Sequence, residues 1–305
     1  MHYSVLLNES IELLNINPEG IYIDGTFGRG GHSRKILTKL STSGRLVAFD
    51  KDPEAIEFAN QQFNDSRFSI YHTSFADSEI ILQEKYGRVD GVLLDLGISS
   101  PQIDNSERGF SFRYDAYLDM RMNNKSGMSA ADFIASATED TLSKVFWEYG
   151  EERFSRQIAK AIIETRKTEA INTTFKLANL VESVIGRREI AKHPATRVFQ
   201  AIRIYINNEL GDLEKFLATV PQLLNLHGRI VVISFHSLED RIVKNKFKQL
   251  SSARDLPRWV MQEAESAEFK VIAKKIKASK QELTENNRSR SAVMRCLERV
   301  IAKND

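Results

Sequence analysis

The sequence contains only one cysteine, Cys296, so no disulfide can form within the chain. This excludes the small disulfide-stapled domains of secreted proteins and fits the reducing cytoplasm. The N-terminal residues become polar after a few positions and show no signal-like apolar run. No run of about eighteen apolar residues occurs, so we predict no membrane span and a cytoplasmic protein.

Motifs of several common protein classes are also missing. The chain has no Gly-x-Ser-x-Gly elbow, which argues against a serine hydrolase. It has no Gly-Lys-Ser or Gly-Lys-Thr either, which argues against a phosphate-cradling nucleotidase. Its six histidines are scattered and its cysteine stands alone, so the spacing predicts no metal site.

A strong net charge is absent, because 43 Lys and Arg nearly balance 41 Asp and Glu. The balance is uneven, however: residues 241–305 hold 16 basic against 8 acidic side chains, and residues 150–205 hold 11 against 6. Such segments would suit a polyanionic partner, because Lys and Arg release counterions from a phosphate backbone. Solvated helix surfaces would show the same bias, so charge alone leaves both interpretations open.

Strand and helix signals alternate from residue 20 to residue 94. Short apolar runs predict strands, and helical spacing predicts a helix over 32–40 and another that begins at Asp52-Pro53-Glu54, where Asp52 can cap exposed amides. Strands separated by helices indicate a parallel sheet with right-handed crossovers. The predicted strands cover residues 21–24, 46–50, 67–71 and 89–94.

This alternation stops at Asp95, and 133 positions separate Asp95 from the start of the next strand signal, 228–234. A crossover in such a sheet needs far fewer residues, so we expect an insertion. We therefore predict a discontinuous sheet domain, residues 1–104 and 211–305, and an inserted helical domain, residues 105–210. Within the insertion and after it, helices are predicted at 129–135, 138–147, 152–165, 174–185, 195–210 and 210–226, and closing strands at 269–275 and 291–300.

A glycine-rich loop follows the first strand, with the sequence Asp24-Gly25-Thr26-Phe27-Gly28-Arg29-Gly30-Gly31-His32. Glycines let the main chain turn tightly and approach a ligand, and open parallel sheets bind ligands at this edge. Asp50 ends the next strand, where a carboxylate can accept hydrogen bonds from a ribose diol, although it could instead cap the following helix. The loop lacks the Gly-x-Gly-x-x-Gly dinucleotide pattern, which favours a methyltransferase over a dehydrogenase.

Asp95 and the segment Ser99-Ser100-Pro101-Gln102 follow the fourth predicted strand. An exocyclic amine shares its lone pair with the base ring, so acceptors that bind its hydrogens make the nitrogen a better nucleophile. Methyl transfer to that amine would be an in-line displacement accelerated by positioning and electrostatics. An ordinary serine-proline turn remains the alternative.

A further polar cluster begins at His236, just past the 228–234 strand. Ser237 and Asp240 have the spacing of a capping box at a helix start. His236 could contact a substrate or simply hold this turn, and the sequence leaves both roles open.

Together these motifs resemble the bacterial small-subunit ribosomal RNA cytosine N(4)-methyltransferases, also called the RsmH or MraW family. The resemblance extends over nearly the whole chain and implies a class I S-adenosylmethionine-dependent methyltransferase sheet with a helical insertion. The blocks that carry it are 24–32, 94–102, 107–112, 118–122, 149–154, 193–197, 233–244 and 288–292.

The family methylates a cytidine in the decoding centre of 16S rRNA, cytosine 1402. The resemblance thus implies S-adenosylmethionine as donor, S-adenosylhomocysteine as product, no metal, and 16S rRNA or the small ribosomal subunit as partner. It leaves the oligomeric state open, a homodimer included. The implied donor site comprises Gly30, Gly31, His32, Asp50, Phe75, Asp95 and Gln102, to which the loop pattern adds Asp24.

The same resemblance implies that Asp95, Ser99, Ser100 and Pro101 hold the amine. Many amino-methyltransferases carry Asp/Asn/Ser-Pro-Pro-aromatic at this place, and Ser99 to Gln102 depart from it, which puts the identity of the amine-holding group in doubt. The inserted domain would then bind RNA through cations and aromatic surfaces around an unstacked or flipped cytosine. Its candidate residues are Arg108, Phe110, Phe112, Arg113, Arg121, Arg153, Arg156, Arg197 and Arg203, with His236 from the sheet domain.

Three other functions fit part of the pattern. A DNA amino-methyltransferase would share the loop and the acids, but commonly carries the Pro-Pro-aromatic signature. A dehydrogenase would bind a nicotinamide cofactor and not the methyl donor. A non-catalytic RNA-binding or assembly factor could retain the fold, although the intact set of Asp24, Asp50 and Asp95 argues against it.

Overall fold

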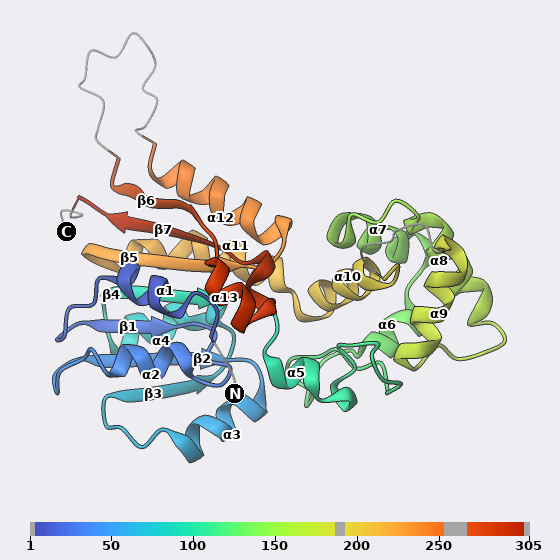
Figure 1. Cartoon of the computed structure of the whole chain (residues 1–305), viewed down its shortest axis with the longest axis horizontal. Coiled ribbons are helices and arrows are strands. Elements are labelled where there is room, and N and C mark those ends of the chain that lie inside the picture. Colours follow the sequence, from blue (N-terminus) through green and yellow to red (C-terminus); the bar gives the residue numbers. More distant parts are fainter. Residues whose placement is uncertain (1–3, 187–192, 253–266, 302–305) are drawn as a thin grey trace, which may run out of the picture. The chain divides into compact units, whose positions relative to one another are not determined.

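The computed structural model describes residues 4–186, 193–252 and 267–301 (Figure 1). The chain divides into two compact units, Met1–Gly97 with Leu210–Asp305, and Ile98–Glu209. The Ser99–Gln102 segment, which we expected to lie in the sheet domain, therefore belongs to the second unit. No helix in the described ranges is both long and apolar enough to cross a bilayer.

The first unit contains a seven-stranded sheet in the order β3-β2-β1-β4-β5-β7-β6 (Figure 1). Adjacent strands from β3 to β5 run parallel, whereas β7 is antiparallel to both of its neighbours. This arrangement confirms the predicted class I methyltransferase sheet. The strands are β1 (Ile21–Asp24), β2 (Arg45–Asp50), β3 (Phe68–His72), β4 (Val89–Asp95), β5 (Leu224–Ser234), β6 (Phe269–Ile276) and β7 (Val293–Arg299).

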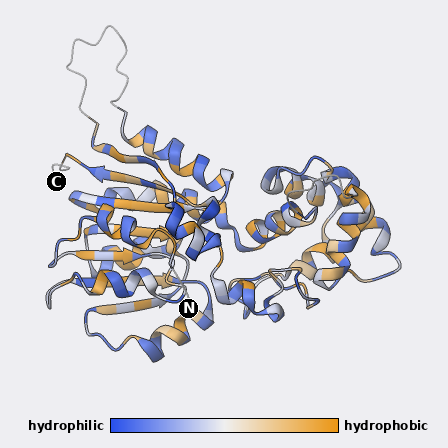
Figure 2. Ribbon diagram, viewed as in Figure 1, coloured by the Kyte–Doolittle hydropathy of each residue, from blue (hydrophilic) through white to orange (hydrophobic). Residues whose placement is uncertain are grey.

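Helices cover both faces of the sheet, because its central strands are apolar on each side (Figure 2). On β4, Val92 and Leu94 pack with one face cluster and Leu93 with the other. The first face receives α4 (Ser78–Lys85), α11 (Glu209–Thr219) and α12 (Ser237–Leu250). The second receives α1 (Leu7–Leu14) and α2 (Gly31–Leu37), and α3 (Pro53–Gln62) packs with a smaller aromatic cluster.

The predicted start of α3 is confirmed, since Asp52 accepts a hydrogen bond from the Glu54 amide at 3.0 Å and Pro53 opens the helix. Three short helices of the first unit, α1, α4 and α13 (Lys280–Glu285), were not predicted, because a few turns of mixed sequence carry little periodicity. The first unit also contains the short 3-10 turns η1 (Phe75–Asp77), η3 (Val220–Leu223) and η4 (Asn287–Ser291). The helix expected over 210–226 ends at Thr219, and β5 begins at Leu224.

The second unit consists of helices around a hydrophobic core of its own. Among the described residues of this unit, the regular elements besides the Tyr117–Thr173 bridge are helical. The elements are α5 (Ser100–Asp104), η2 (Ser106–Arg108), α6 (Ala130–Ser136), α7 (Glu139–Gly150), α8 (Ser155–Thr165), α9 (Thr174–Ile185) and α10 (Thr196–Asn207).

Candidate functional site

The glycine loop joins β1 to α2 and lies against the ends of β2 and β4. The Gly25 amide donates to the Leu93 carbonyl at 2.9 Å, and the Gly28 amide donates to Asp50 Oδ2 at 2.7 Å. Gly30 adopts a left-handed conformation with φ of 68°, and a Cβ there would lie 2.3 Å from the Phe63 ring. Only glycine therefore fits this position, which caps the start of helix α2.

Asp24, at the end of β1, is buried beneath this loop. Its carboxylate accepts a hydrogen bond from the Ser33 hydroxyl at 2.6 Å and one from the Thr26 amide at 3.2 Å. Burial raises the pKa of Asp24 to about 6, and these two hydrogen bonds oppose the shift. Asp24 thus joins the loop to α2.

Asp50, at the end of β2, is half-buried and organises the turn that follows it. Its two oxygens accept hydrogen bonds from the Gly28 amide and, at 2.8 Å, from the Asp52 amide. Because Asp52 caps α3, Asp50 is not needed for that role. Burial raises the pKa of Asp50 to about 6, with smaller contributions from the charges of Asp52 and Asp24.

Asp95 ends β4, which neighbours β1 in the sheet. Its amide donates to the Thr26 hydroxyl at 2.6 Å, and its buried Oδ1 has no hydrogen-bond partner among the described residues. Burial raises the pKa of Asp95 well above its usual value, and the charges of Asp24, Glu239 and Glu282 add to the shift. A buried carboxylate oxygen without a donor is costly, which marks it as a place for a ligand hydrogen.

His32 lies between Asp95 and the N-terminal segment. His32 is buried, its Nε2 lies 3.1 Å from the Val5 carbonyl, and its Nδ1 lies 3.8 Å from Asp95 Oδ2. A carbonyl only accepts, so Nε2 carries the hydrogen. A Cβ on Gly31 would lie 1.9 Å from the Ser4 hydroxyl, so this segment packs closely on the start of α2.

Phe75 is half-buried at the start of η1 and lies beside the glycine loop. Its Cβ is 3.1 Å from where a Cβ on Gly25 would be. Its ring meets Phe216 of α11 edge-on, with centroids 5.4 Å apart. From the sequence alone Phe75 would be assigned to the core, and the structure places it next to the candidate site.

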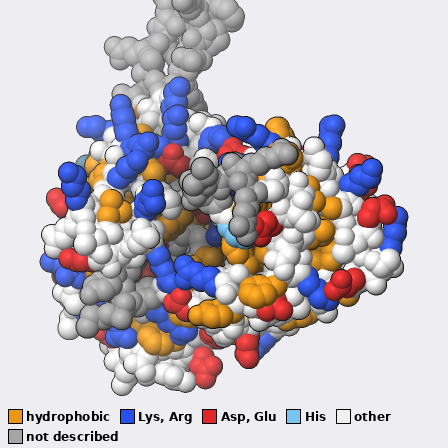
Figure 3. Space-filling view, turned by 45° about the vertical axis from the view of Figure 1, so that its right-hand side comes forward, with side chains coloured by type: hydrophobic (Ala, Val, Ile, Leu, Met, Phe, Trp, Pro, Cys, Tyr) orange, Lys and Arg blue, Asp and Glu red, His pale blue; other side chains and the backbone are white. Residues whose placement is uncertain are grey.

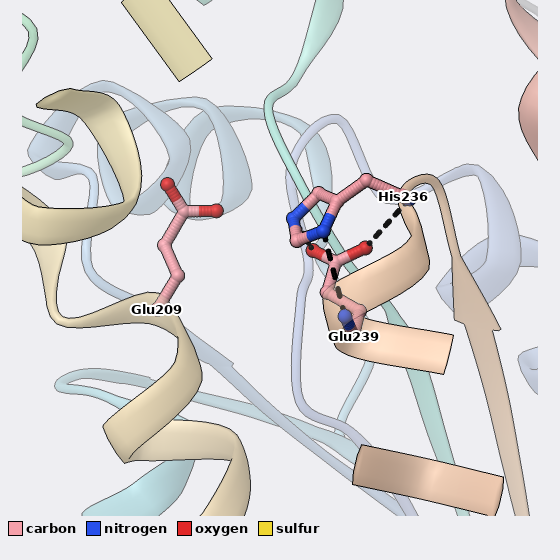
Figure 4. Close-up of side chains that lie close together, drawn as sticks. All are labelled: Glu209, His236 and Glu239. Atoms are coloured by element: carbon pink, nitrogen blue, oxygen red, sulfur yellow. Dashed lines mark hydrogen bonds and ion pairs between the residues drawn. The ribbon is translucent and has the colours of Figure 1, made fainter. Parts of the chain in front are cut away.

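The helix cap after β5 differs from our prediction by one residue. The capping residue of α12 is His236, whose partner is Glu239, and not the pair Ser237 and Asp240. Figure 4 shows the His236 ring beside the Glu239 side chain. His236 Nε2 lies 3.1 Å from a Glu239 oxygen, and the buried Glu239 carboxylate also accepts a hydrogen bond from the Phe235 amide at 2.8 Å. A ring nitrogen here accepts from the helix amide as a serine oxygen would, a role that the sequence pattern of capping boxes does not anticipate.

Asp240 instead forms a two-point ion pair with Arg295 of β7, at 2.7 and 2.8 Å. Glu209, also drawn in Figure 4, belongs to the second unit, where it pairs with Arg203 at 2.7 and 2.8 Å.

In the second unit, the predicted serine-proline turn is the first turn of α5. Ser99 caps this helix in a capping box with Gln102, and the Ser99 amide donates to Gln102 Oε1 at 2.9 Å. Pro101 lies in the first turn, as is common, and Ser100 begins the helix. Ser99 and Gln102 thus bind each other in a helix cap, which we did not predict from the sequence.

Several of the candidate RNA-contacting residues are used within the second unit itself. Arg108 is buried and donates to the carbonyls of Arg121 and Met122 at 3.0 and 2.8 Å. Phe110 lies in the unit's core, and Phe112 packs on His193 and Phe199.

The remaining arginines of this set differ in how they are held. Arg121 forms a two-point pair with Asp119, at 2.9 and 2.7 Å. Arg197 lies 3.9 Å from the buried Glu152. Arg113, Arg153 and Arg156 are exposed.

The structure also identifies residues near the candidate site that the sequence did not single out. Thr26 and Ser33 bind Asp95 and Asp24, as described above. A third such residue is Asp212 of α11, which lies 2.5 Å from the Lys51 ammonium and accepts a hydrogen bond from the Ser74 hydroxyl. The sequence around Thr26, Ser33 and Asp212 does not predict these contacts, because each contact joins separate elements.

Acidic side chains thus end three adjacent parallel strands, β2, β1 and β4, around a glycine loop. This is the edge at which open parallel sheets bind ligands. At this edge the Asp50 carboxylate is half-buried, and one oxygen of Asp95 has no hydrogen-bond partner among the described residues.

Comparison with known proteins agrees with this geometry. A curated relative from Francisella tularensis subsp. novicida is 50% identical over 307 residues, covering 98% of this chain and 100% of that protein. Relatives from Marinomonas sp. (52%; 98% of this chain, 97% of that protein) and Chromobacterium violaceum (51%; 99% and 96%) match equally well. All three are named ribosomal RNA small subunit methyltransferase H. The model of the MraW methylase family matches residues 1–300, so the chain is a methyltransferase that belongs to the MraW methylase family.

Proposed function

We propose that the chain transfers a methyl group from S-adenosylmethionine to the exocyclic N(4) of a cytidine in 16S rRNA, at cytosine 1402. The observation that carries this proposal is the set of Asp24, Asp50 and Asp95 at the ends of adjacent strands around the glycine loop. The names of the relatives support the rRNA substrate, and family resemblance supports the N(4) position.

The residues of the first unit fit the donor. Asp50 is half-buried at the strand end where a ribose diol is bound in related sheets, and its carboxylate can accept two hydroxyl hydrogens. Phe75 lies beside the loop and offers a flat apolar surface to an adenine ring. The backbone at Gly30 and Gly31 can approach the amino-acid part closely. His32 of the first unit and Gln102 of the second unit are proposed as further donor contacts.

The proposed reaction uses Asp95 as an acceptor for the target amine. The bound donor supplies an electrophilic methyl carbon on its sulfonium. Asp95 Oδ1, buried and without a hydrogen-bond partner among the described residues, would accept a hydrogen bond from the amine and direct the nitrogen lone pair at that carbon. As the N–C bond forms, the C–S bond breaks, S-adenosylhomocysteine leaves, and the methylated nitrogen loses one proton. Positioning and preorganised electrostatics would then provide most of the rate, with no covalent enzyme intermediate. Ser99, Ser100 and Pro101 are proposed to complete the amine site.

The basic surface of α12 and β6 supports an RNA substrate. Residues 241–252 and 269–280 contain nine Lys or Arg and no acidic residue. Among them Arg241, Lys244, Lys248, Lys270, Lys274 and Lys275 are exposed. Figure 3 shows Lys and Arg side chains gathered on the upper part of this view. Residues 253–266 and 302–305 of the 241–305 segment lie outside the described residues. They hold three basic against four acidic side chains, so the positive excess of this segment comes from its described part.

We propose that this basic surface and the exposed Arg113, Arg153 and Arg156 contact phosphates of the RNA, because dispersed exposed cations suit a backbone and not a single base. Arg108, Phe110 and Arg121 then shape the second unit, since their side chains are held within it. The partner would be 16S rRNA in the small subunit or an assembly intermediate, in the cytoplasm.

The test is transfer of labelled methyl from S-adenosylmethionine to small ribosomal subunits from cells that lack this activity, followed by nucleoside analysis. Labelled N(4)-methylcytidine supports the proposal. Labelling of naked duplex DNA instead would favour a DNA amino-methyltransferase. Nicotinamide binding without donor binding would favour a dehydrogenase, and donor binding without turnover an assembly factor.

A further inference from the structure

Asp212 is a buried carboxylate on α11 that holds two segments of the sheet edge at once. Its side chain accepts a hydrogen bond from the Ser74 hydroxyl and lies 2.5 Å from the Lys51 ammonium. The Ser74 hydroxyl in turn accepts the Ala76 amide at 3.1 Å, which fixes the start of η1. Neither Lys51 nor Ser74 is near Asp212 in sequence, so packing of α11 creates this contact.

The two partners of Asp212 are direct chain neighbours of two proposed donor residues. Lys51 follows Asp50, the proposed ribose acceptor, and Ser74 precedes Phe75, the proposed adenine neighbour. Phe216 lies one helical turn after Asp212 on α11 and meets the Phe75 ring edge-on. The same face of α11 therefore supports the Phe75 backbone through Ser74 and the Phe75 ring through Phe216.

We propose that Asp212 is a positioning residue that couples the ribose side and the adenine side of the donor site. This inference rests on the proposed function. β2 and β3 pair up to Asp50 and His72, and Asp212 then ties together the segments that follow these strand ends. It thereby orients the Phe75 ring relative to the Asp50 carboxylate. Its effect is on binding of the adenosine part, and not on the transfer step at Asp95.

A matched control exists on the same two elements. Lys215 of α11 pairs with Asp77 of η1 at 2.6 Å, but both side chains are more than half exposed. Exposed ion pairs of this kind contribute little. Asp77→Asn therefore removes one carboxylate charge between α11 and η1 without touching Asp212, Lys51 or Ser74.

The experiment compares Asp212→Asn, Asp212→Ala and Asp77→Asn by calorimetric titration with S-adenosylhomocysteine and with adenosine alone. Turnover at saturating donor and thermal unfolding are measured in parallel. We expect Asp212→Asn to weaken binding of both ligands about tenfold, with turnover at saturation within about twofold of the parent chain. Asp212→Ala should weaken binding further, and Asp77→Asn should leave it within about twofold.

Equal affinity of Asp212→Asn and the parent chain would overturn the inference, as would loss of turnover at unchanged affinity or an equal loss in Asp77→Asn. If Asp212→Ala does not fold, Ser74→Ala tests the same coupling and should weaken adenosine binding. Absence of donor binding by the parent chain would instead defeat the proposed function, so the two failures are distinguishable.

Discussion

The backbone amide of Asp95 donates a hydrogen bond to the side-chain oxygen of Thr26 at 2.6 Å. Thr26 lies in the glycine loop after β1, and Asp95 is the last residue of β4, so this contact ties the proposed donor loop to the proposed catalytic acid. The Thr26 amide also donates to Asp24, which places one residue between two of the three strand-end carboxylates.

Thr26→Val should therefore reduce turnover about tenfold, because it keeps the side-chain shape but leaves the Asp95 amide without its acceptor. The free energy of unfolding should fall by about 1 to 3 kcal/mol, the usual effect of an unpaired buried donor. Steady-state methylation and chemical denaturation measure both quantities. Thr26→Ser restores the hydroxyl and should restore turnover; equal activity of the Val and Ser variants would contradict the role.

Asp95→Asn should lower turnover by at least about 100-fold, because the amide lacks the charge that supports the amine in the transition state. Its stability should be equal to or above that of the parent chain, since Asp24, Glu239 and Glu282 all repel an ionised Asp95. Single-turnover methylation and thermal unfolding test this pair of expectations. Near-normal methylation would remove Asp95 from the mechanism.

Asp90→Asn is the control on the same strand. Asp90 accepts hydrogen bonds from the Ile21 amide at 2.8 Å and from Asn225 at 2.9 Å, at the opposite end of β4 from Asp95. This variant should lower stability and retain turnover, the reverse of Asp95→Asn.

Gly30→Ala should abolish donor binding and destabilise the fold, because a Cβ would enter the Phe63 and Phe27 rings. Gly87→Ala is a matched control, since Gly87 has a φ of 72° but nothing within 4 Å of an added Cβ. Both variants carry the penalty of a left-handed backbone, about 1 to 2 kcal/mol. Calorimetry and unfolding should show the additional loss only in Gly30→Ala; equal behaviour of the two would mean that the close packing of the loop is unimportant.

Donor affinity should rise with pH around 6, because ribose hydroxyls donate to the ionised form of Asp50, whose pKa burial raises to about 6. Stability should change in the opposite sense. An aspartate with a raised folded-state pKa binds more protons when folded, so stability falls as pH rises from about 4 to about 6 and is constant above.

Titration with S-adenosylhomocysteine from pH 5 to 7.5, in buffers of different ionisation enthalpy, should show proton release near pH 6. Asp50→Asn should bind weakly and lose the pH dependence. If the affinity of Asp50→Asn still changes near pH 6, the titrating group is another one. Asp24 is then the first to examine, because burial raises its pKa to about 6 as well.

Reversing charge on α12 should weaken RNA binding selectively. Lys244→Glu with Lys248→Glu should reduce affinity for small-subunit rRNA at least tenfold and lower the salt dependence of binding, with donor affinity unchanged. The control is Lys35→Glu with Lys39→Glu, the same charge change on one exposed lysine in α2 and one just after it. Filter binding over a range of salt concentrations compares the two double variants. An equal loss of RNA affinity in both would indicate a general charge effect.

The sequence by itself determined most of the sheet and the chemistry at its edge. Apolar runs separated by helical patterns located every strand, and a glycine loop followed by acids at strand ends located Asp24, Asp50 and Asp95. These signals are local, because periodicity, turns and caps depend on neighbouring residues. Local patterns also misled: the box Ser237–Asp240 was predicted, whereas His236 caps α12 with Glu239.

Only the tertiary structure decided which groups meet. Asp212 reaches Ser74 from 138 positions away, Thr26 receives the Asp95 amide from 69 positions away, and Glu239 and Glu282 add their charges to Asp95. Packing likewise turned Arg108 inward, although its sequence context suggested an exposed cation. Such contacts depend on how helices dock on the sheet, and burial then sets the pKa of each carboxyl. No short stretch of sequence encodes these contacts or these pKa shifts, since both arise between elements that are remote along the chain.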